Sequence, residues 1–363
     1  MKFIKSLLVI SSVLFVSLSF ISISNASPPS VTPDTPFKLA TFEADGIIRL
    51  GMVFDNIILD ITGANAALMA AENLKSPHMP KDMRSLIENY DHLKSRLYQI
   101  ANYYAGGAEG RSFSFDIAKV SLKAPIKYPY NILAAAANYQ DHTKEMTASD
   151  GSAVKPVDPD VDPPVFFAKS PRSTIMDPNS SFPIPKGPPL GRAWDFENEL
   201  AVIIGKKADS IGMDNYQDYV FGYSIVFDVS ARIDPSFPVV KRAGINFGVN
   251  WMESKSRDNA APFGPFITPK EFIGDSANLK INTVINGVEK QNGNTKDMIH
   301  DVPHLLRHAT SIMSLYPGDI VMTGTPSGVG AARNPPEFLK PGDVLEMTIE
   351  NIGTLVTTIT KEQ

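Results

Sequence analysis

The chain contains no cysteine among its 363 residues. Disulfide bonds, thiolate metal sites and lipid attachment at a cysteine are therefore excluded. Histidine is also scarce, at six residues, which leaves little from which to build a histidine-rich zinc site. The chain has no basic run and a formal net charge of −5, so nucleic acid is not an expected partner.

The first 26 residues have the pattern of a secretory signal peptide. Lys2 and Lys5 form a short basic start, residues 7–23 are apolar with interspersed serines, and Ser24-Asn25-Ala26 is a small-residue cleavage site. We expect cleavage after Ala26, a secreted or periplasmic location, and no membrane contact after cleavage. Because the apolar stretch is slightly long for a signal peptide, an uncleaved membrane anchor is the alternative.

Turn-forming residues are spread along the whole chain. The 29 prolines and 24 glycines indicate many turns and a β-rich protein. Short apolar runs predict strands at 37–42, 47–54 and 57–61, and helical spacing predicts helices at 64–76 and 81–104. We expect the signal peptide at 1–26, a small α/β N-terminal domain at 27–125, and a larger domain at 126–361.

The most informative stretch places three acids on alternate positions, Asp195, Glu197 and Glu199, directly before the apolar run 200–204. In one continuous strand, these carboxylates would share a face at spacings of roughly 6 to 7 Å, at the edge of a buried cleft. Oxygen ligands of this kind suit Mg²⁺ first, then Mn²⁺ or Ca²⁺. The alternative is a strand end that is wetted by solvent and holds no metal.

Two further segments add polar groups to this picture. The next apolar strand, at 219–228, ends in Asp228, which supplies a third oxygen ligand if the two strands pair. His142 and Glu145 stand at i and i+3 on a helical turn, where a carboxylate can orient an imidazole as a general base. A solvated helix face is the alternative for this pair. The long loop 147–164 that follows is typical of a functional or mobile segment.

A glycine-rich turn lies at 323–328, after a strand and without the lysine of a P-loop. Its backbone N–H groups, including that of Gly324, and the Thr325 hydroxyl could bind a substrate carboxylate or carbonyl oxygen. The alternative is a simple tight turn. His304 and His308 lie four apart in a predicted helix at 303–313, but the segment between them lacks a zincin glutamate, which favours an ordinary helix face.

Six motifs occur in a fixed order: NYQDHTKEM, DFENEL, FDVSAR, INGVEKQNGNT, PGDIVMTGTPSGVG and PGDVLEMTIENIGTL. Together they resemble the fumarylacetoacetate hydrolase family over roughly residues 126–361. The segment FKLATFEADGIIRLGMV also resembles the N-terminal domain of the longer members. The resemblance implies a mixed β-roll of the fumarylacetoacetate hydrolase type, an α+β and β-rich fold with a small α/β N-terminal domain. It also implies a homodimer that acts on a small molecule.

The same resemblance assigns roles to individual residues. It implies that the divalent cation, usually Mg²⁺, is bound by two glutamates and one aspartate, here Glu197, Glu199 and Asp228. It implies that His142 and Glu145 form the catalytic dyad of a lid that orders over the substrate, with 147–164 as its continuation. Asp195 matches a position that is not a ligand.

Two cations complete the implied site. Lys255 matches the lysine that supports the metal site and developing negative charge, and Arg232 matches an arginine near the substrate carboxylate, where a guanidinium fork suits two oxygens. A structural salt bridge is the alternative for Arg232. Two positions depart from the usual pattern, because Pro235 replaces a substrate-contacting glutamine and Arg257 replaces a phenylalanine. The substrate therefore stays open.

Three functions are compatible with these features. The first is metal-assisted hydrolysis of a carbon–carbon bond in a β-diketone or acylpyruvate-type acid through a metal-stabilised enolate. The second is another reaction of the family, namely a 2-oxo acid decarboxylase, tautomerase, isomerase or hydratase. The third is a non-catalytic exported binding protein. Retention of His142 and Glu145 favours the hydrolase.

Overall fold

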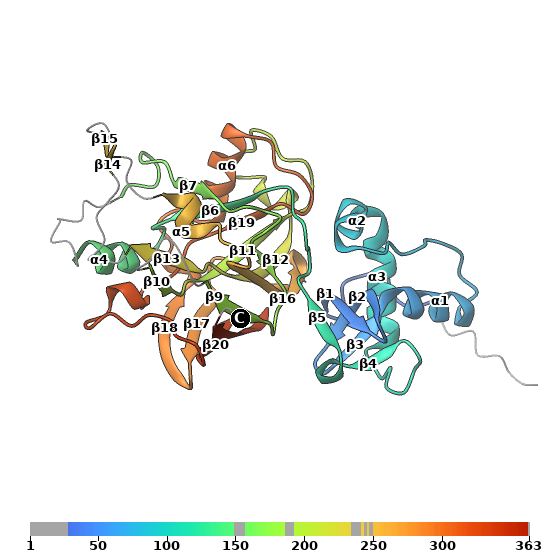
Figure 1. The fold of residues 1–363 in the computed structure, drawn as a ribbon. Coiled ribbons are helices and arrows are strands. Elements are labelled where there is room, and N and C mark those ends of the chain that lie inside the picture. Colours follow the sequence, from blue (N-terminus) through green and yellow to red (C-terminus); the bar gives the residue numbers. More distant parts are fainter. Residues whose placement is uncertain are drawn as a thin grey trace, which may run out of the picture.

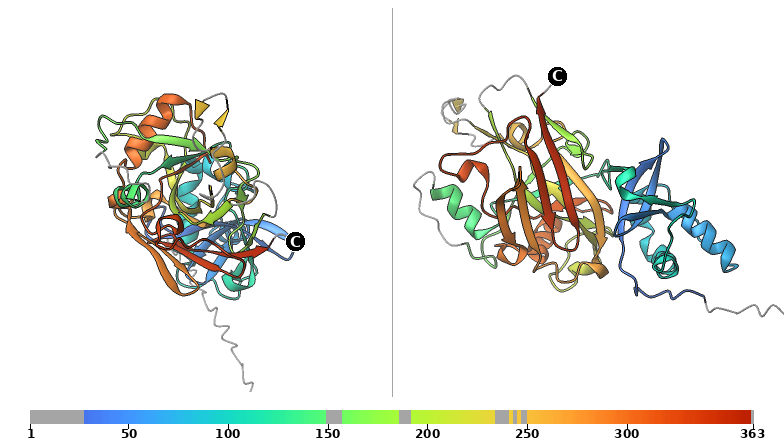
Figure 2. Two further views of the ribbon diagram at one scale, coloured as in Figure 1. Left: turned by 60° about the vertical axis from the view of Figure 1, so that its left-hand side comes forward. Right: turned by 90° about the horizontal axis from the view of Figure 1, so that it is seen from below.

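The computed structural model describes residues 28–148, 157–185, 192–233, 241–242, 245–246 and 250–361. The ribbon forms a smaller N-terminal lobe and a larger lobe (Figures 1 and 2). The predicted signal peptide with its cleavage site, the first part of the 147–164 loop, and Pro235 lie outside the described residues. None of the helices in the described ranges is both long and apolar enough to cross a membrane.

The smaller lobe is a β-meander followed by helices, in the order that the sequence predicts. Its turns fall at Asp45-Gly46 and Asp55-Asn56, and Asp45, Gly46 and Asp55 have the positive φ that tight hairpins require. The predicted helix at 81–104 is two helices, which meet at Asn89. The elements of this lobe are β1 Lys38–Ala44, β2 Ile47–Phe54, β3 Ile57–Asp60, α1 Ile61–Ala71, α2 Met83–Glu88, α3 Tyr90–Tyr104, β4 Ser114–Asp116 and β5 Ser121–Lys123.

The larger lobe is mostly strands, with three α-helices among its described residues. Its helices are α4 Gln140–Ala148, α5 Trp251–Lys255 and α6 Val302–Ile312. Its strands are β6 Ile132–Ala136, β7 Val165–Ala168, β8 Ile175–Met176, β9 Ser181–Ile184, β10 Arg192–Asp195, β11 Asn198–Ile204, β12 Val220–Phe227, β13 Ser230–Ile233, β14 Lys241–Arg242, β15 Ile245–Asn246, β16 Ala261–Pro269, β17 Lys280–Ile285, β18 Val288–Asn294, β19 Ile320–Met322, β20 Val344–Ile349 and β21 Gly353–Lys361.

One sheet runs through both lobes. Its strand order is β4-β3-β2-β1-β16-β12-β11-β19-β6-β7, and the lobes join where Leu39 of β1 pairs with Ile267 of β16. A second sheet has the order β18-β17-β20-β21-β9. Most pairs are antiparallel, but β19–β6, β21–β9 and β16–β8 are parallel. The predicted fold class, a β-rich α+β protein with mixed sheets, is therefore confirmed.

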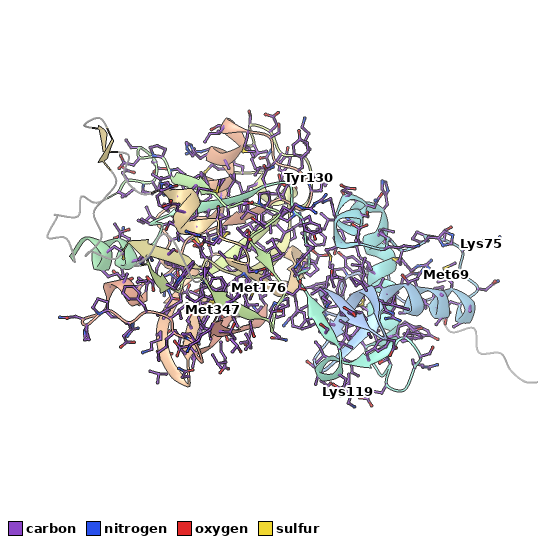
Figure 3. All side chains as sticks on the ribbon, viewed as in Figure 1. Met69, Lys75, Lys119, Tyr130, Met176 and Met347 are labelled. Atoms are coloured by element: carbon purple, nitrogen blue, oxygen red, sulfur yellow. The ribbon has the colours of Figure 1, made fainter. Side chains whose placement is uncertain are left out.

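Strand β11 lies at the centre of the larger lobe, between two apolar cores. Alternate residues Leu200, Val202 and Ile204 pack into the core shared with the five-stranded sheet, which also contains Met176 and Met347 (Figure 3). Ala201 and Ile203 face the other core, which continues into the N-terminal lobe. The prediction of a strand buried on both faces is confirmed, and the strand fixes the position of the acids at its start.

The prediction of one continuous acidic strand is wrong. Strand β10 ends at Asp195 and pairs with β13, whereas β11 begins at Asn198 and pairs with β12 and β19. The chain changes partner strands at Phe196 and Glu197, so Asp195 does not share a strand face with the two glutamates. At the break, Asp195 pairs with Ser230 and Asn198 with Phe227, and local alternation does not report such distant partners.

Candidate metal centre and active site

Three carboxylates meet where β11 begins and β12 ends. The Asp228 N–H donates to the Glu197 carbonyl oxygen at 2.9 Å, which joins the two strand ends. Glu197, Glu199 and Asp228 each offer an oxygen within 4.8 Å of the others, and all three side chains are buried. The pairing that the sequence suggested for these strands is therefore present, and it brings together all three predicted ligands.

Three cations surround this cluster. Lys255 Nζ donates to Glu197 at 2.7 Å, to Asp228 at 2.5 Å and to the Ser230 hydroxyl at 2.6 Å. Lys169 Nζ donates to the other Asp228 oxygen at 2.5 Å. Arg232, the third cation, donates to Glu197. Buried charges are stable only when they are paired in this way.

Burial and the neighbouring charges separate the pKa values of the two glutamates. Burial alone would raise the pKa of Glu197, but Lys255 and Arg232 overcome it and hold the pKa below its usual range. The pKa of Glu199 lies well above its usual value, because of burial first and then the negative charges of Asp228 and Glu197. Among the described residues, no cation pairs directly with Glu199 as Lys255 and Arg232 pair with Glu197, and a bound metal ion would supply that positive charge.

The donor set fits a hard divalent cation. All three groups are carboxylates, they lie at the adjoining ends of the paired strands β11 and β12, and they are held close together in a buried position. Such an ion usually keeps several water molecules, so three carboxylates are enough protein ligands to hold it. Glu197, Glu199 and Asp228 would hold the ion, and Lys255 and Lys169 would limit the mutual repulsion of the acids.

The predicted dyad is assembled on α4. His142 Nδ1 donates to Glu145 Oε1 at 2.7 Å, and the His142 side chain is buried. The other Glu145 oxygen accepts from the Gly328 N–H at 2.8 Å. A carboxylate held at both oxygens fixes the imidazole tautomer and leaves Nε2 as the basic nitrogen.

The glycine-rich turn and the short helix η5 (Gly330–Ala332) that follows it donate N–H groups to three acids. Gly324 donates to Glu199 at 2.7 Å, Gly328 to Glu145 at 2.8 Å, and Gly330, at the start of the short 3-10 helix η5, to Asp195 at 2.7 Å. The turn therefore connects the metal centre, the dyad and the Asp195 strand.

Larger residues do not fit at these glycines. A Cβ at position 328 would lie 2.1 Å from the Lys290 carbonyl oxygen, and one at position 330 would lie 1.9 Å from that of Glu337. The Thr325 hydroxyl donates to the Asn198 carbonyl oxygen at 3.0 Å. The predicted substrate-binding roles of Gly324 and Thr325 stay predictions.

Arg232 forms the salt bridges that the sequence gave as an alternative to substrate binding. Its Nε donates to Asp195 at 2.9 Å, and another guanidinium nitrogen donates to Glu197. Burial lowers the pKa of Arg232, but the two carboxylates raise this pKa by more than burial lowers it. The guanidinium is therefore fixed in its charged form. The side chain is 20% exposed. A role for Arg232 in substrate binding stays a prediction.

Lys169 is a site residue that the sequence did not reveal. It follows β7, its side chain is fully buried, and its partner is one of the predicted metal ligands. Burial lowers its pKa, and the charge of Asp228 opposes that effect. The local sequence Ala168-Lys169-Ser170 carries no signal of this role, because the partner lies 59 residues further along the chain.

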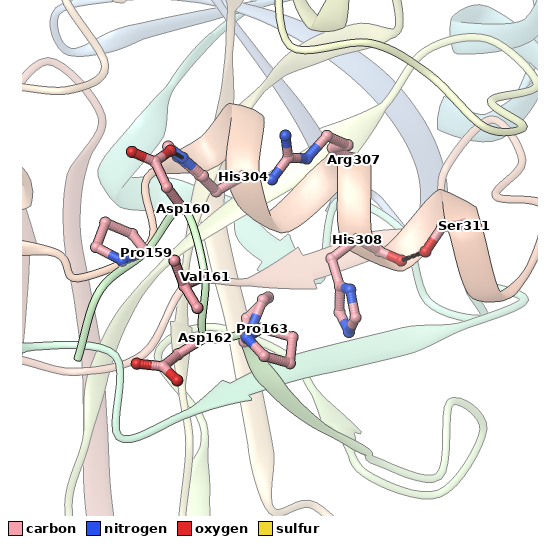
Figure 4. A pocket seen from close by; sticks show the side chains of 10 residues that line it. Pro159, Asp160, Val161, Asp162, Pro163, His304, Arg307, His308 and Ser311 are labelled. Atoms are coloured by element: carbon pink, nitrogen blue, oxygen red, sulfur yellow. Dashed lines mark hydrogen bonds and ion pairs between the residues drawn. The ribbon is translucent and has the colours of Figure 1, made fainter.

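The described end of the 147–164 loop packs against α6 (Figure 4). Residues 159–164 and α6 line an open cavity of about 310 Å³, to which α6 contributes His304, Arg307, His308 and Ser311. His300 Nε2 donates to the Asp162 carbonyl oxygen at 2.8 Å, which anchors the loop. No residue of the three-carboxylate cluster lines this cavity, so it is separate from the metal centre.

The mixed β fold and the buried three-carboxylate centre define a divalent-metal enzyme. Residues 131–360 match the family model described as fumarylacetoacetate (FAA) hydrolase C-terminal. The chain belongs to the fumarylacetoacetate hydrolase family, as the motifs predicted.

Characterised relatives differ in reaction. The chain is 34% identical over 322 residues to the oxaloacetate tautomerase YisK of Bacillus subtilis, covering 88% of this chain and 98% of that protein. It is 29% identical to a solved structure of maleylpyruvate hydrolase from Sphingobium sp. SYK-6 in complex with manganese(II) and pyruvate, with a TM-score of 0.64 over 90% of this chain and 100% of that one. A fumarylacetoacetate hydrolase from Exiguobacterium antarcticum is also 29% identical, with a TM-score of 0.63 and the same coverage.

Proposed function

We propose that the protein is a divalent-metal-dependent hydrolase that cleaves a carbon–carbon bond in a β-diketone or acylpyruvate-type acid. One observation carries this proposal: His142 and Glu145 are already hydrogen-bonded at 2.7 Å, and one glycine-rich turn donates both to Glu145 and to Glu199 of the carboxylate cluster. A pre-oriented base beside a cation site is the arrangement that activation of a water molecule needs. The solved manganese and pyruvate complex of a hydrolase of the family supports the same chemistry.

The residues of this chain divide the reaction between them. A divalent cation, Mg²⁺ in our proposal, supplies a Lewis acid at Glu197, Glu199 and Asp228. His142 Nε2 takes a proton from water, and the hydroxide adds to the substrate carbonyl carbon. The carbon–carbon bond then breaks, and its electron pair stays on the 2-oxo acid fragment. That fragment takes up a proton, so the products are a carboxylic acid and a 2-oxo acid.

Lys255 stabilises the negative charge that develops in this reaction. Its ammonium group is buried against Glu197 and Asp228, and their charges raise its pKa although burial opposes them. It therefore stays protonated, and in a site from which water is excluded a fixed positive charge has a large effect on an anionic transition state. Arg232 and Thr325 remain our candidates for contacts to the substrate carboxylate.

Oxaloacetate tautomerisation is the second candidate. The relative with that activity matches nearly its whole length to this chain at 34% identity. In a tautomerase, His142 would move a proton between carbon and oxygen instead of removing one from water. Both reactions need the same cation and the same base, so the products must be measured to separate them.

The test uses chelator-treated protein reloaded with Mg²⁺ or Mn²⁺. Acylpyruvates, β-diketones and oxaloacetate are followed by ultraviolet absorbance and by product analysis, with His142→Ala beside the wild type. For the hydrolase, we expect metal-dependent release of a carboxylic acid and a loss of roughly 10²- to 10⁴-fold in the variant. Enol–keto conversion of oxaloacetate without carbon–carbon cleavage would favour the tautomerase, and metal binding without turnover would favour a binding protein.

We also propose that the protein is exported and forms a homodimer. Residues 1–26 support export, because they combine a basic start, an apolar stretch and a small-residue cleavage site. Cell fractionation with N-terminal sequencing should recover a chain that begins at Ser27 outside the cytoplasm. Sedimentation equilibrium should give twice the mass of the mature chain, and a monomer at micromolar concentration would contradict the dimer.

A further inference from the structure

Helix α5 carries an aromatic residue next to the lysine of the metal centre. Trp251 and Lys255 stand at i and i+4, so they lie on the same face of the helix, one turn apart. Lys255 Nζ reaches Glu197 at 2.7 Å and Asp228 at 2.5 Å. The face that points toward the carboxylates therefore also carries the indole.

Phe167 of β7 connects the indole to this lysine. The Phe167 and Trp251 rings are stacked, with centroids 4.7 Å apart and planes at 10°. Lys255 Nζ lies 5.1 Å from the Phe167 centroid. The Trp251 ring is thus at most about 10 Å from the ammonium group. Phe167 is 8% exposed whereas Trp251 is 40% exposed, so the indole forms the open side of this aromatic layer.

The aromatic layer is held in a fixed position. Asn250 caps α5, and the Ser254 hydroxyl donates to the Ala231 carbonyl oxygen of β13 at 3.0 Å. On the other side, the Ser170 N–H donates to the Ser256 hydroxyl at 3.0 Å. A rigid indole can bind a partner with little loss of conformational entropy.

We infer that Trp251 determines substrate specificity by stacking on an apolar or conjugated tail of the 2-oxo acid. This inference rests on the proposed function and adds a preference among its substrates. The carboxylate and carbonyl oxygens of the substrate belong at the buried cation site, so the remaining carbon chain must extend toward solvent. Among the described residues, Trp251 is the exposed aromatic side chain that is one helical turn from a lysine of that site.

The test compares two 2-oxo acids that differ in their tails and lack the second ketone of an acylpyruvate, so neither offers a bond for the proposed hydrolysis. Binding of pyruvate and of 2-oxo-4-phenylbutanoate to the Mn²⁺-loaded protein is measured by calorimetry. For Trp251→Ala, we expect affinity for the phenyl compound to fall at least about fivefold, consistent with the loss of an aromatic stack. Affinity for pyruvate should stay within about twofold, and Trp251→Phe should recover most of the difference.

Met252 provides the matched control. It is 65% exposed on the same helix but lies about 100° further round, so Met252→Ala should leave both affinities unchanged. The fluorescence of the two tryptophans of the chain can also be told apart, because Trp194 is buried against Phe182 whereas Trp251 is exposed. The phenyl compound should therefore change the emission of wild-type protein and leave that of Trp251→Phe unchanged.

Three results would overturn the inference. Equal losses for both acids in Trp251→Ala would indicate general support of the site, and unchanged affinities would place the tail elsewhere. Conversion of a wild-type dimer to a monomer in Trp251→Ala would assign the indole to a subunit interface. Since binding is measured without turnover, a tail preference that depends on Trp251 would stand even if acylpyruvate cleavage failed. Cleavage without that preference would leave the proposed function intact.

Discussion

The metal centre and the junction between the lobes use the same chemical groups in opposite surroundings. At the centre, Lys169 and Asp228 form an ion pair of 2.5 Å with both side chains fully buried. At the junction, Lys206 and Asp91 form an ion pair of 2.8 Å with side chains 55% and 50% exposed. The geometry is similar, and the dielectric environment is not.

Burial therefore decides what each pair does. Exposed pairs are screened by water and contribute about 0–1 kcal/mol. Burying charges costs desolvation free energy, and the attraction between the charges only offsets that cost. A buried cluster of charges is therefore weak evidence that it stabilises the fold and stronger evidence that it has a function. The junction instead derives its cohesion from the apolar core that both lobes share and from the β1–β16 pairing.

Asp228→Asn should show the largest effect. The substitution leaves the buried ammonium groups of Lys169 and Lys255 with one carboxylate fewer, and removing one member of a buried ion pair costs about 3–5 kcal/mol. We expect a loss of that size in the free energy of unfolding, measured in urea, together with loss of Mn²⁺ binding in calorimetry. Asp91→Asn is the matched exposed control. If both variants lost the same stability, burial would not be the deciding variable.

Lys169→Met should lower the stability of the metal-free protein and raise its affinity for the metal ion. The fully buried ammonium group competes with a cation for Asp228, and two unit charges 4 Å apart interact by about 4 kcal/mol at the effective dielectric constant of about 20 that describes even buried protein sites. We expect Mn²⁺ affinity to rise roughly tenfold and the unfolding free energy of the metal-free protein to fall by about 1–3 kcal/mol. Lys206→Met, at the exposed pair, should change neither by a measurable amount. Weaker Mn²⁺ binding in Lys169→Met would assign this lysine to ligand positioning instead.

Tyr98→Phe tests the buried part of the junction. The Tyr98 hydroxyl donates to Glu271 of the larger lobe at 2.6 Å, and the side chain is 8% exposed. Loss of one such bond should cost about 1 kcal/mol of unfolding free energy, an intermediate effect. Tyr103→Phe, on the same helix and 39% exposed, is the control. Equal stability of the two variants would mean that the hydrogen bond to Glu271 contributes nothing.

The smallest effect belongs to the pH dependence of Asp91. Hydrogen bonds from Lys206 and then Lys94 lower its pKa from 3.8 to about 2. A lowered carboxyl pKa stabilises the folded state above pH 3.8, and this contribution is lost as the pH falls through 2. Since the side chains are half exposed, we expect no more than about 0.5 kcal/mol. In thermal melts between pH 5 and pH 2, the Tm of Asp91→Asn should fall slightly less with decreasing pH than the Tm of the wild type. A Tm that falls more steeply in the variant would contradict the assignment.

The sequence predicts contacts that are encoded locally. The apolar run at 200–204 identifies β11, and the acid at the end of the next strand identifies Asp228, because each signal lies within one element. The hairpin turns at Asp45-Gly46 and Asp55-Asn56 are predictable for the same reason. The three ligands could therefore be proposed from strand patterns and family motifs alone.

Contacts between distant segments are not predictable in this way. Lys169 is an ordinary lysine until the fold places it against Asp228, 59 residues away. The break at Phe196 and Glu197 depends on which strand each half pairs with. Helix α5 has five residues, too few for a periodic pattern to appear. In each case, tertiary packing supplies information that local propensity lacks.

The glycine-rich turn makes neighbouring positions differ greatly in their tolerance of substitution. Gly324, Gly328 and Gly330 each serve a different acid through an amide that every residue except proline possesses, yet the surrounding atoms leave no room for a side chain. Ser327, between them, is only half-buried. Thr325 and Val329 are buried, so saturation mutagenesis of this segment should yield forbidden codons at most positions and a permissive codon at Ser327. Such a pattern would let the enzyme vary this loop in evolution only at the positions whose side chains point away from the machinery.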